Sequence, residues 1–290
     1  MNQMSNREYH ARKDACSSSW LKRAVQKSAL HADMPFKATA AMKLGTIVHT
    51  LVLEPEEKSA IIMPDINTAS KKGWAEFGEW VHEREPENDP VYTEYRVTKK
   101  SDVLEHLERV TGLPVVSQDV ASKAIAMRDA VMAHPEAAKL LKGGQPEFTV
   151  FAEIDGFECK ARVDYRRDDI HTNIELKTCA DASPDGFRRQ FENMMYDLSV
   201  AWYERVLAEA GHHTEETIVI AVENTEPYGV RVMSVSEDLK MRGWELAEIG
   251  FKMWKEKQFL GESAGYPTGI DDLEPSPWAW NVVKALKGEM

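Results

Sequence analysis

The sequence has few cysteines and no long apolar stretch. Its three cysteines, Cys16, Cys159 and Cys179, are far apart in the chain and odd in number, which argues against a disulfide framework or a closed zinc site. No apolar run approaches the ~20 residues that a membrane-spanning helix needs. The first thirty residues are polar and charged, unlike a signal peptide. These absences predict a cytoplasmic protein without a membrane partner.

The sequence also lacks an excess of positive charge. Its formal net charge is −12 at pH 7, whereas proteins that bind nucleic acid are usually basic because lysine and arginine neutralise the phosphates. The basic side chains are unevenly placed, however, since residues 12–43 hold seven of them against two acidic ones. A basic groove on an acidic body would suit an enzyme that moves along DNA, so the charge permits DNA binding without demanding it.

The hydrophobic pattern changes at Gly143-Gly144, from helical spacing before it to strand-like alternation after it. We therefore expect an α/β fold in one domain, 1–290, with a mainly helical part over 1–143 and a sheet-containing part over 144–290. The expected elements are helices over 38–53, 118–133, 193–210 and 236–259, strands over 147–154, 157–165, 173–177, 217–224 and 230–234, and a short docking helix within 275–286.

Two neighbouring strands carry a group of charged side chains. Asp164 stands at the end of the first, and Glu175 and Lys177 lie two residues apart on the second, so they project to the same face with Leu176 behind them. Two carboxylates and an ammonium at strand ends are typical of a hydrolytic metal site, in which the lysine steers water or a phosphate oxygen. The plainer alternative is an exposed ion pair on an edge strand.

Context separates this triplet from similar ones. An acidic residue followed two positions later by lysine occurs four times in the chain. Only Glu175–Lys177 lies on a strand eleven residues after a strand-end aspartate. The Glu158–Lys160 pair also lies on a strand, but the nearest acid before it belongs to a hairpin turn, Asp155-Gly156. The three other pairs are Glu56–Lys58, Glu158–Lys160 and Asp238–Lys240.

Three features upstream have two interpretations each. The serines 17–19 precede a helix start and form a cap, but free N–H groups at a helix start also bind anions. His49 lies on or beside the apolar face of its helix, as a satisfied core residue or as a ligand. Glu147 begins a strand, as a solvated acid or as a third carboxylate of the site.

Taken together, the SSSWLK helix start, the AAMKLGTIVHTLVLEP helix and the VDY…IELKT pair resemble the RecE-type 5′→3′ exonucleases (exonuclease VIII) of phages and prophages. These belong to the PD-(D/E)xK nuclease superfamily, and the resemblance extends from about Tyr9 to Trp278. It implies a nuclease core with a central mixed β-sheet flanked by helices. It also implies Mg²⁺ as cofactor, with Mn²⁺ able to substitute because a histidine in the coordination shell tolerates it.

The resemblance also implies roles for individual residues. Lys177 would position or activate the attacking water and act with two catalytic carboxylates, Asp164 and Glu175. The implied metal ligands are His49, Asp164, Glu175 and the backbone carbonyl of Leu176. The implied additional site residues are Glu147, Gln190, Tyr196 and Tyr203, and the implied contacts to the 5′-phosphate or other DNA are Ser19, Lys22, Arg23 and Arg162.

One position departs from the family pattern. The family commonly carries a glutamine four residues before a tyrosine on the helix that follows the lysine strand. Here Tyr203 is present, but Ser199 stands at the glutamine position. Gln190, nine residues upstream of Ser199, is the candidate to replace it. The departure concerns substrate positioning rather than the metal centre.

The sequence thus predicts a Mg²⁺-dependent 5′→3′ exonuclease that degrades one strand of linear double-stranded DNA and leaves 3′ single-stranded tails for recombination by strand annealing. The implied partners are double-stranded DNA ends, a RecT-type single-strand annealing protein and further copies of the chain in a homo-oligomeric ring. Two alternatives stay open. One is an endonuclease on the same core, and the other is a catalytically weak DNA-end-binding or regulatory protein.

Overall fold

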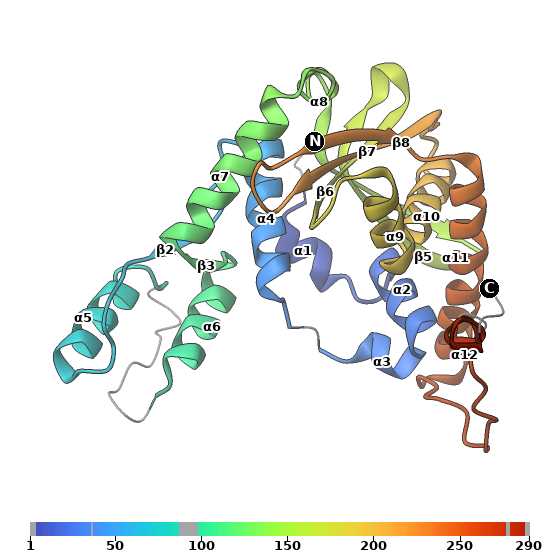
Figure 1. Cartoon of the computed structure of the whole chain (residues 1–290), viewed down its shortest axis with the longest axis horizontal. Helices are drawn as coiled ribbons and strands as arrows, with labels where there is room; N and C mark the ends of the chain where they lie inside the picture. Colours follow the sequence, from blue (N-terminus) through green and yellow to red (C-terminus); the bar gives the residue numbers. More distant parts are fainter. Residues whose placement is uncertain (1–3, 36, 87–97, 277–278, 288–290) are drawn as a thin grey trace.

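The computed structural model describes residues 4–35, 37–86, 98–276 and 279–287. Its centre is a six-stranded mixed sheet in the order β1-β5-β6-β7-β8, with β4 paired to β5 (Figure 1). The expected α/β fold with a central mixed sheet flanked by helices is confirmed. The strands of this sheet are β1 (Cys16–Ser17), β4 (Gln145–Ile154), β5 (Phe157–Arg167), β6 (Thr172–Cys179), β7 (Glu216–Glu223) and β8 (Val230–Ser234).

The strands pair as a meander followed by a crossover. β4, β5 and β6 are successive antiparallel neighbours, whereas β6 and β7 are parallel. Parallel neighbours need a long connection, here two helices. The β4–β5 hairpin turns at Asp155-Gly156, where both residues have positive φ, as the Asp-Gly pair predicts. The antiparallel pairing of β5 with β6 places the charged residues of these two strands side by side.

Helices cover both faces of the sheet (Figure 1). On one face, Ile47 and Val48 pack with Leu176 and Ile220 of the sheet. On the other, Trp202 and its neighbours pack against the strands. The first face carries α4 (Ala40–Leu53), α7 (Gln118–Ala133) and α8 (Pro135–Leu140), and the second carries α2 (Ser18–Gln26), α10 (Tyr196–Glu209) and α11 (Glu237–Leu260). The shorter elements are α1 (Asn6–Ala11), α3 (Ala29–Asp33), the 3-10 helix η1 (Asp168–Ile170), α9 (Pro184–Asn193) and α12 (Ala279–Lys287).

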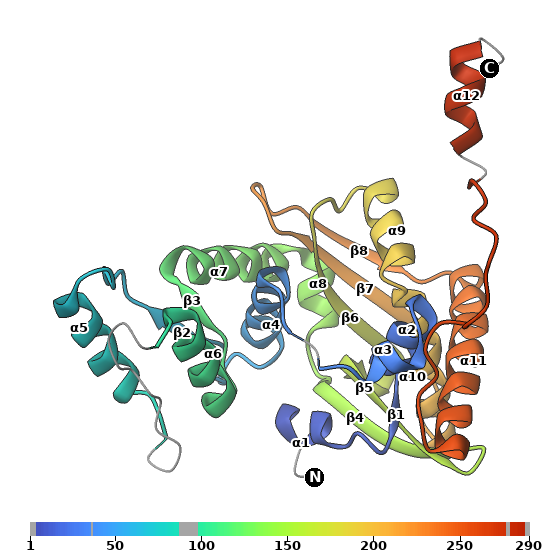
Figure 2. The ribbon, with the colours of Figure 1, turned by 90° about the horizontal axis from the view of Figure 1, so that it is seen from below.

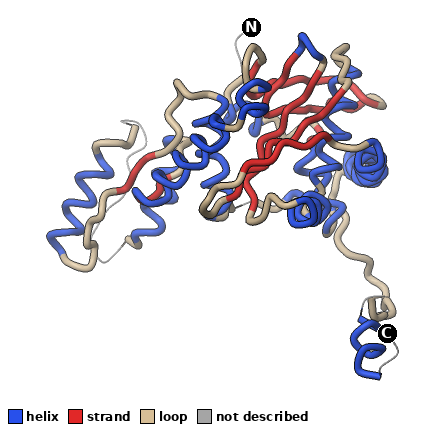
Figure 3. Tube along the Cα trace, turned by 45° about the horizontal axis from the view of Figure 1, so that its top comes forward, coloured by secondary structure: helices blue, strands red, loops and turns tan. Residues whose placement is uncertain are grey.

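A separate lobe projects between α4 and α7. It contains a hydrophobic cluster of its own, with Trp74, Phe77 and Leu107 at its centre. Figures 1 and 3 show its helices set apart from the sheet. We call residues 61–117 the insertion lobe. Its elements are β2 (Ile61–Met63), α5 (Lys71–His82), α6 (Lys100–Thr111) and β3 (Val115–Ser117), with β2 and β3 paired in parallel. That the chain folds as a single nuclease domain stays a prediction.

Three expectations about single elements need correction. Asp164 lies inside β5, which continues to Arg167, rather than at its end. The expected helix over 193–210 forms as α10 but begins later, at Tyr196, because Met195 adopts left-handed backbone angles (φ 48°) between α9 and α10. The expected C-terminal helix begins at Ala279, and Trp278 lies outside the described residues. None of the described helices has the length and apolar composition needed to cross a membrane.

Candidate metal centre

One face of β5 is lined with charged side chains. Alternate residues of the strand enter the apolar core, among them Ala161 and Val163, which are fully buried. The residues between them occupy the opposite face, because strand side chains alternate. That charged face consists of Lys160, Arg162, Asp164 and Arg166, all largely buried. A buried charge is costly unless it is paired or coordinates a metal, so the partners of each side chain indicate its role.

The acidic and basic triplet converges as the sequence predicts. Lys177 Nζ lies 2.8 Å from Asp164 Oδ2 and 2.7 Å from Glu175 Oε2, and it donates hydrogen bonds to both. The backbone N–H of Leu176 donates to the same Asp164 oxygen at 2.8 Å. Glu175 is only 3% exposed and its strand is interior to the sheet, so the exposed edge-strand ion pair is not what forms.

Two residues from other elements complete the acidic cluster. His49 of α4, Glu147 of β4 and Asp164 each offer a ligand atom, and these atoms lie within 4.8 Å of one another. Glu147 occupies the register position opposite Asp164, between the pairs Pro146–Tyr165 and Phe148–Val163. Its positive φ of 49° marks a local departure from strand geometry at this position. Two side chains far apart in the sequence thus join the triplet.

His49 has the hydrogen-bond arrangement of a metal-binding histidine. Its Nε2 lies 2.6 Å from the Leu176 carbonyl oxygen, which can only accept, so Nε2 carries the proton. Nδ1 then has a free lone pair, and it lies 3.9 Å from Asp164 Oδ1. Metal-binding histidines commonly donate their second ring N–H to a backbone carbonyl in this way. The Leu176 carbonyl keeps a second lone pair for the ligand role that the sequence assigned to it.

The buried groups of the cluster shift one another's pKa values. Burial and then the charge of Asp164 raise the pKa of Glu175 to about 7 and that of Glu147 to about 8. Burial opposes the charge on Lys177, yet Asp164 and Glu175 hold its pKa well above the usual value. Burial also opposes the charge on Asp164, but Lys177 and His49 outweigh it and lower its pKa. Burial lowers the pKa of His49, which favours the neutral ring.

The side chains present fit a divalent cation. Glu175 Oε1 is buried and has no hydrogen-bond partner in the part of the chain that the structure describes. An unpartnered carboxylate oxygen in a protein interior is costly and is a reason to infer an ion or water. Carboxylates, a neutral imidazole and a carbonyl oxygen are suitable ligands for Mg²⁺ or Mn²⁺. A bound cation would also offset the mutual repulsion that raises the carboxyl pKa values.

The N-terminus of α2 lies beside this cluster. The capping residue is Ser17, whose hydroxyl accepts from the Trp20 N–H, whereas Ser19 is exposed in the first turn. The Ser17 and Ser19 hydroxyl oxygens are 3.1 Å apart. Ser18 donates a hydrogen bond to the Tyr203 hydroxyl at 3.2 Å and ties α2 to α10. The serine run therefore caps the helix and also leaves one hydroxyl open to solvent.

Lys22 is directed toward the triplet of Asp164, Glu175 and Lys177. Burial and then the charge of Lys177 lower the pKa of Lys22 to about 8. Both ammonium groups lie over the ring of Tyr196, Lys22 at 5.4 Å and Lys177 at 5.6 Å from its centroid. The expected site residues Lys22 and Tyr196 are thus brought to the cluster. Two ammonium groups on one aromatic ring favour an anion between them.

Two other expected residues have partners in the fold. Arg23 donates to the main-chain carbonyls of His31 and Met34 around α3. Gln190 Nε2 donates to the Thr178 carbonyl at 3.1 Å, next to the end of β6. These contacts account for the side chains structurally, and the DNA-binding role of Arg23 stays a prediction.

Arg162 joins the cluster to α1. It donates to Thr149 at 2.7 Å and to the Met4 carbonyl at 3.0 Å, and one guanidinium nitrogen lies 3.7 Å from Glu147. Its guanidinium also lies 4.1 Å from the centroid of the Tyr9 ring. It is therefore a buried structural cation as well as the partner of Glu147, and its expected contact with DNA stays a prediction.

Sequence reasoning missed one residue, Glu54, and left the role of another, Ser199, open. Ser199 Oγ is buried without a hydrogen-bond partner among the described residues, on the same helix as Tyr196 and Tyr203. Its departure from the family pattern was the signal, although the sequence could not show that the hydroxyl is unpartnered. Glu54 ends α4, and its charge helps to raise the pKa of Glu147. The Glu-Pro at the end of that helix was the signal for Glu54.

The comparisons with known proteins agree with this geometry. A family model described as a PDDEXK-like domain of unknown function (DUF3799) matches residues 17–254. The chain belongs to this family. The expected PD-(D/E)xK superfamily is thereby confirmed, and the narrower RecE-type assignment stays a prediction. No curated protein matches the sequence.

Two solved structures are similar to this PDDEXK-like chain. A crystal structure from Eubacterium rectale described as "putative exonuclease" has a TM-score of 0.59 and 12% identity, and all of each chain is covered. A phage-related exonuclease from Haemophilus somnus has a TM-score of 0.29 and 9% identity, over 84% of this chain and 96% of the other. The first likeness supports the fold alone, and the second is too distant to carry an argument.

Proposed function

We propose that this PDDEXK-like protein is a metal-dependent deoxyribonuclease that degrades linear duplex DNA from its 5′ ends. The observation that carries the proposal is the buried cluster of Asp164, Glu175 and Lys177, in which one Glu175 oxygen has no partner among the described residues. A fold that only needed an ion pair here would satisfy both carboxylate oxygens. The cluster is instead under-compensated in positive charge, as a site that receives a cation should be.

Each residue of the cluster has a role in this chemistry. His49, Glu147, Asp164 and Glu175 would hold the cation, which when bound supplies charge neutralisation for the phosphate and a lowered pKa for water. Lys177 keeps its proton because two carboxylates raise its pKa. Its N–H groups can therefore donate to a water molecule or to a phosphate oxygen, and so position the nucleophile.

The α2 N-terminus supports the choice of an end-dependent enzyme. Free N–H groups of its first turn, the exposed Ser19 hydroxyl and the Lys22 ammonium form an anion-binding edge beside the cluster. A terminal 5′-phosphate has more negative charge than a phosphodiester and would gain more from this edge. The scissile bond would then lie at the metal centre, next to the end that is held.

The direct test is nucleotide release from linear duplex DNA. Wild type with Mg²⁺ should release nucleotides from a 5′-phosphorylated duplex labelled at its 5′ end and should leave closed circular DNA intact. Lys177→Ala should lose this activity, whereas the matched variant Lys255→Ala should retain it, because Lys255 forms a surface ion pair with Asp155. An inactive wild type under permissive metal conditions, or equal rates for both variants, would contradict the proposal.

The direction in which the strand is degraded determines which DNA end a partner protein would receive. Resection from 5′ ends leaves 3′ single strands, which an annealing protein of the RecT type would take up for recombination. A duplex with a label at each end separates the two polarities: early release of the 5′ label supports the proposal, and early release of the 3′ label overturns this part of it. Cleavage of closed circles would favour an endonuclease on the same core.

A further inference from the structure

The last described helix of the chain has an unpartnered apolar face. None of the residues of α12 is buried, and Trp280, Val282 and Leu286 are 53%, 57% and 85% exposed. Ala279, Val282, Val283 and Leu286 recur at the 3–4 residue spacing of one helix face, and Trp280 borders that face on the side of the two lysines. Figure 2 shows α12 standing off the body of the protein. An apolar face of this kind on a short helix is a typical anchor for a groove on a partner.

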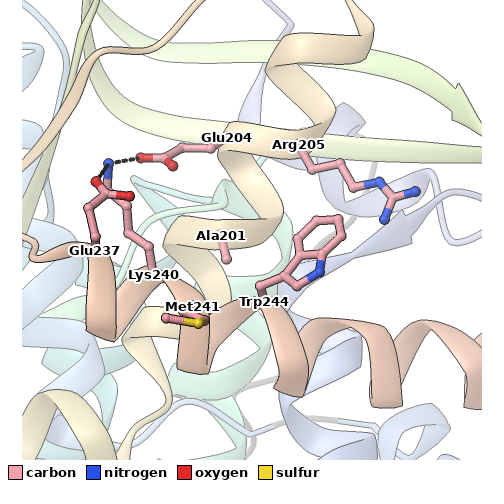
Figure 4. Close-up of a pocket in the computed structure, with 7 residues that line it drawn as sticks. All are labelled: Ala201, Glu204, Arg205, Glu237, Lys240, Met241 and Trp244. Atoms are coloured by element: carbon pink, nitrogen blue, oxygen red, sulfur yellow. Dashed lines mark ion pairs between the residues drawn. The ribbon is translucent and has the colours of Figure 1, made fainter.

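The same chain carries a groove of suitable character between α10 and α11. It has a volume of about 460 Å³, and its floor is formed by Ala201, Met241 and Trp244. Met241 is 61% exposed and Trp244 37% exposed. Figure 4 shows these side chains lying between the two helices, with charged side chains at the rim. The rim consists of Glu204, Arg205, Glu237 and Lys240.

The outward charge of this groove is negative. The side chains of Lys240 and Arg205 are only 12% and 19% exposed and are paired with glutamates. Two of those glutamates, Glu237 and Glu248, are 86% and 43% exposed. The rim thus presents carboxylates to solvent and keeps its cations covered, whereas the charged side chains of α12 are lysines. The helix and the groove are complementary in both polarity and charge.

We propose that α12 of one copy docks into the α10–α11 groove of a second copy of this chain. The α12 helix and the groove then form a heterologous contact, in which every copy offers one helix and one groove. Trp280 is the expected anchor, because a tryptophan that fills an apolar pocket commonly dominates the binding energy. Lys284 and Lys287 would approach the exposed glutamates of the rim.

The linker favours a second copy over docking within one chain. The tail is held to α3 as far as Tyr266, whose ring lies 5.1 Å from that of His31, and a hydrogen bond of 2.9 Å joins Leu30 to Ala264. Residues 267–278 then leave 12 residues, which as a relaxed coil span roughly 20 Å. Residues 237–244 begin α11 and its end is Leu260, a separation of about 24–35 Å. Docking on the same chain would therefore require a stretched linker.

The test is the mass of the purified full-length chain in solution, followed by light scattering across a concentration series. We expect wild type to assemble as concentration rises. Trp280→Ala and Met241→Gln should each raise the apparent dissociation constant at least tenfold. Ile270→Ala is the matched control, because Ile270 is fully exposed on the linker, outside both surfaces. It should assemble like wild type.

A charge exchange makes the test specific. Lys284→Glu should weaken assembly, and adding Glu237→Lys in the same chain should restore it, since both copies then carry the exchanged pair. A wild type that stays monomeric, or assembly that survives both Trp280→Ala and removal of residues 276–290, would overturn the proposal. Lys177→Ala should assemble normally whether or not the protein is a nuclease, so failure of this inference is distinguishable from failure of the proposed function.

Discussion

The charged face of β5 contains two kinds of buried charge. Lys160 and Arg166 have their donors matched by oxygen atoms: Lys160 Nζ donates to the carbonyls of Tyr9 and Arg12 at 2.7 and 2.6 Å. Arg166 donates to Asp168 at 2.9 Å, to Asn173 at 2.8 Å and to other oxygens nearby. Asp164, on the same face of the same strand, belongs to a cluster in which a Glu175 oxygen lacks a partner within the described part of the chain.

The difference separates charges that hold the fold from charges that await a ligand. A buried ion with its hydrogen bonds complete has already recovered much of its desolvation cost. A buried carboxylate with an open oxygen has not, which is why we propose that a ligand completes it. Both groups of charges are buried, so the hydrogen bonds, and not the burial, are what distinguish Asp164 and its neighbours from Lys160 and Arg166.

The largest expected effect is on catalysis. Asp164→Asn keeps the shape and the acceptor for the Leu176 N–H, but it removes a charged ligand from the proposed metal centre. We expect nuclease activity to fall by at least about a thousandfold, or ~4 kcal/mol of transition-state stabilisation. Asp169→Asn, at an exposed ion pair with Arg167, is the control. Initial rates at saturating Mg²⁺ measure both, and equal rates would place Asp164 with the structural charges.

The next largest effect is on stability. Arg166→Leu leaves the oxygens around a side chain that is 1% exposed without their donors. We expect the free energy of unfolding to fall by about 3 kcal/mol in urea denaturation. Arg188→Ala, at a 54% exposed side chain with surface partners, should change it by less than about 0.5 kcal/mol. A small loss for Arg166→Leu would mean that the completed network contributes little to the fold.

Adding metal distinguishes the cluster around Asp164 from the structural charges directly. Mg²⁺ or Mn²⁺ at a hundred times its dissociation constant should raise the free energy of unfolding of wild type by about 2.7 kcal/mol, because it binds only the folded protein. Arg188→Ala should show the same increase, and Asp164→Asn a much smaller one. Thermal unfolding at matched ionic strength measures it. An equal increase in all three would show that the ion binds elsewhere.

The smallest effect concerns Glu175, one of whose two oxygens has no partner among the described residues. Glu175→Gln should raise the free energy of unfolding by about 1 kcal/mol at pH 8 without metal, because it removes a buried charge. In wild type, the Glu175 pKa of about 7 exceeds its ordinary value of 4.5. The folded state therefore holds a proton that the unfolded state releases, and this contribution to stability is lost as the pH rises from about 4.5 to 7. Urea titrations at several pH values should show a flatter profile for the variant.

The sequence predicted the sheet and the triplet because both depend on short-range patterns. The period-2 alternation after Gly143-Gly144 located the meander, and the two-residue spacing of Glu175 and Lys177 placed them on one face. The pairing of β5 with β6 then brings Asp164 to them. His49 and Glu147 required the family resemblance, because no local pattern shows that α4 and β4 meet at β5.

Other features depend on tertiary contacts that no local pattern contains. Met195 separates α9 from α10, and no glycine or proline marks the boundary in the sequence. Charges at alternate positions of β5 would ordinarily indicate a solvated face, yet the backbone carbonyls of the segment around α1 cover Lys160. The aromatic residues of α5 form a separate cluster only because α6 packs beside them. Each outcome was decided by a neighbour distant in sequence.

The insertion lobe has a consequence for how this gene can vary. β2 and β3 run in parallel with Ile61 beside Val115 and Met63 beside Ser117. Neighbouring strands lie about 4.8 Å apart, so the polypeptide leaves the body and rejoins it at nearly the same place. Codons between these strands can be lost, gained or exchanged without altering the distance that α4 and α7 must bridge. The lobe is therefore the position at which we expect a grafted reporter domain to leave the cluster around Asp164 unchanged.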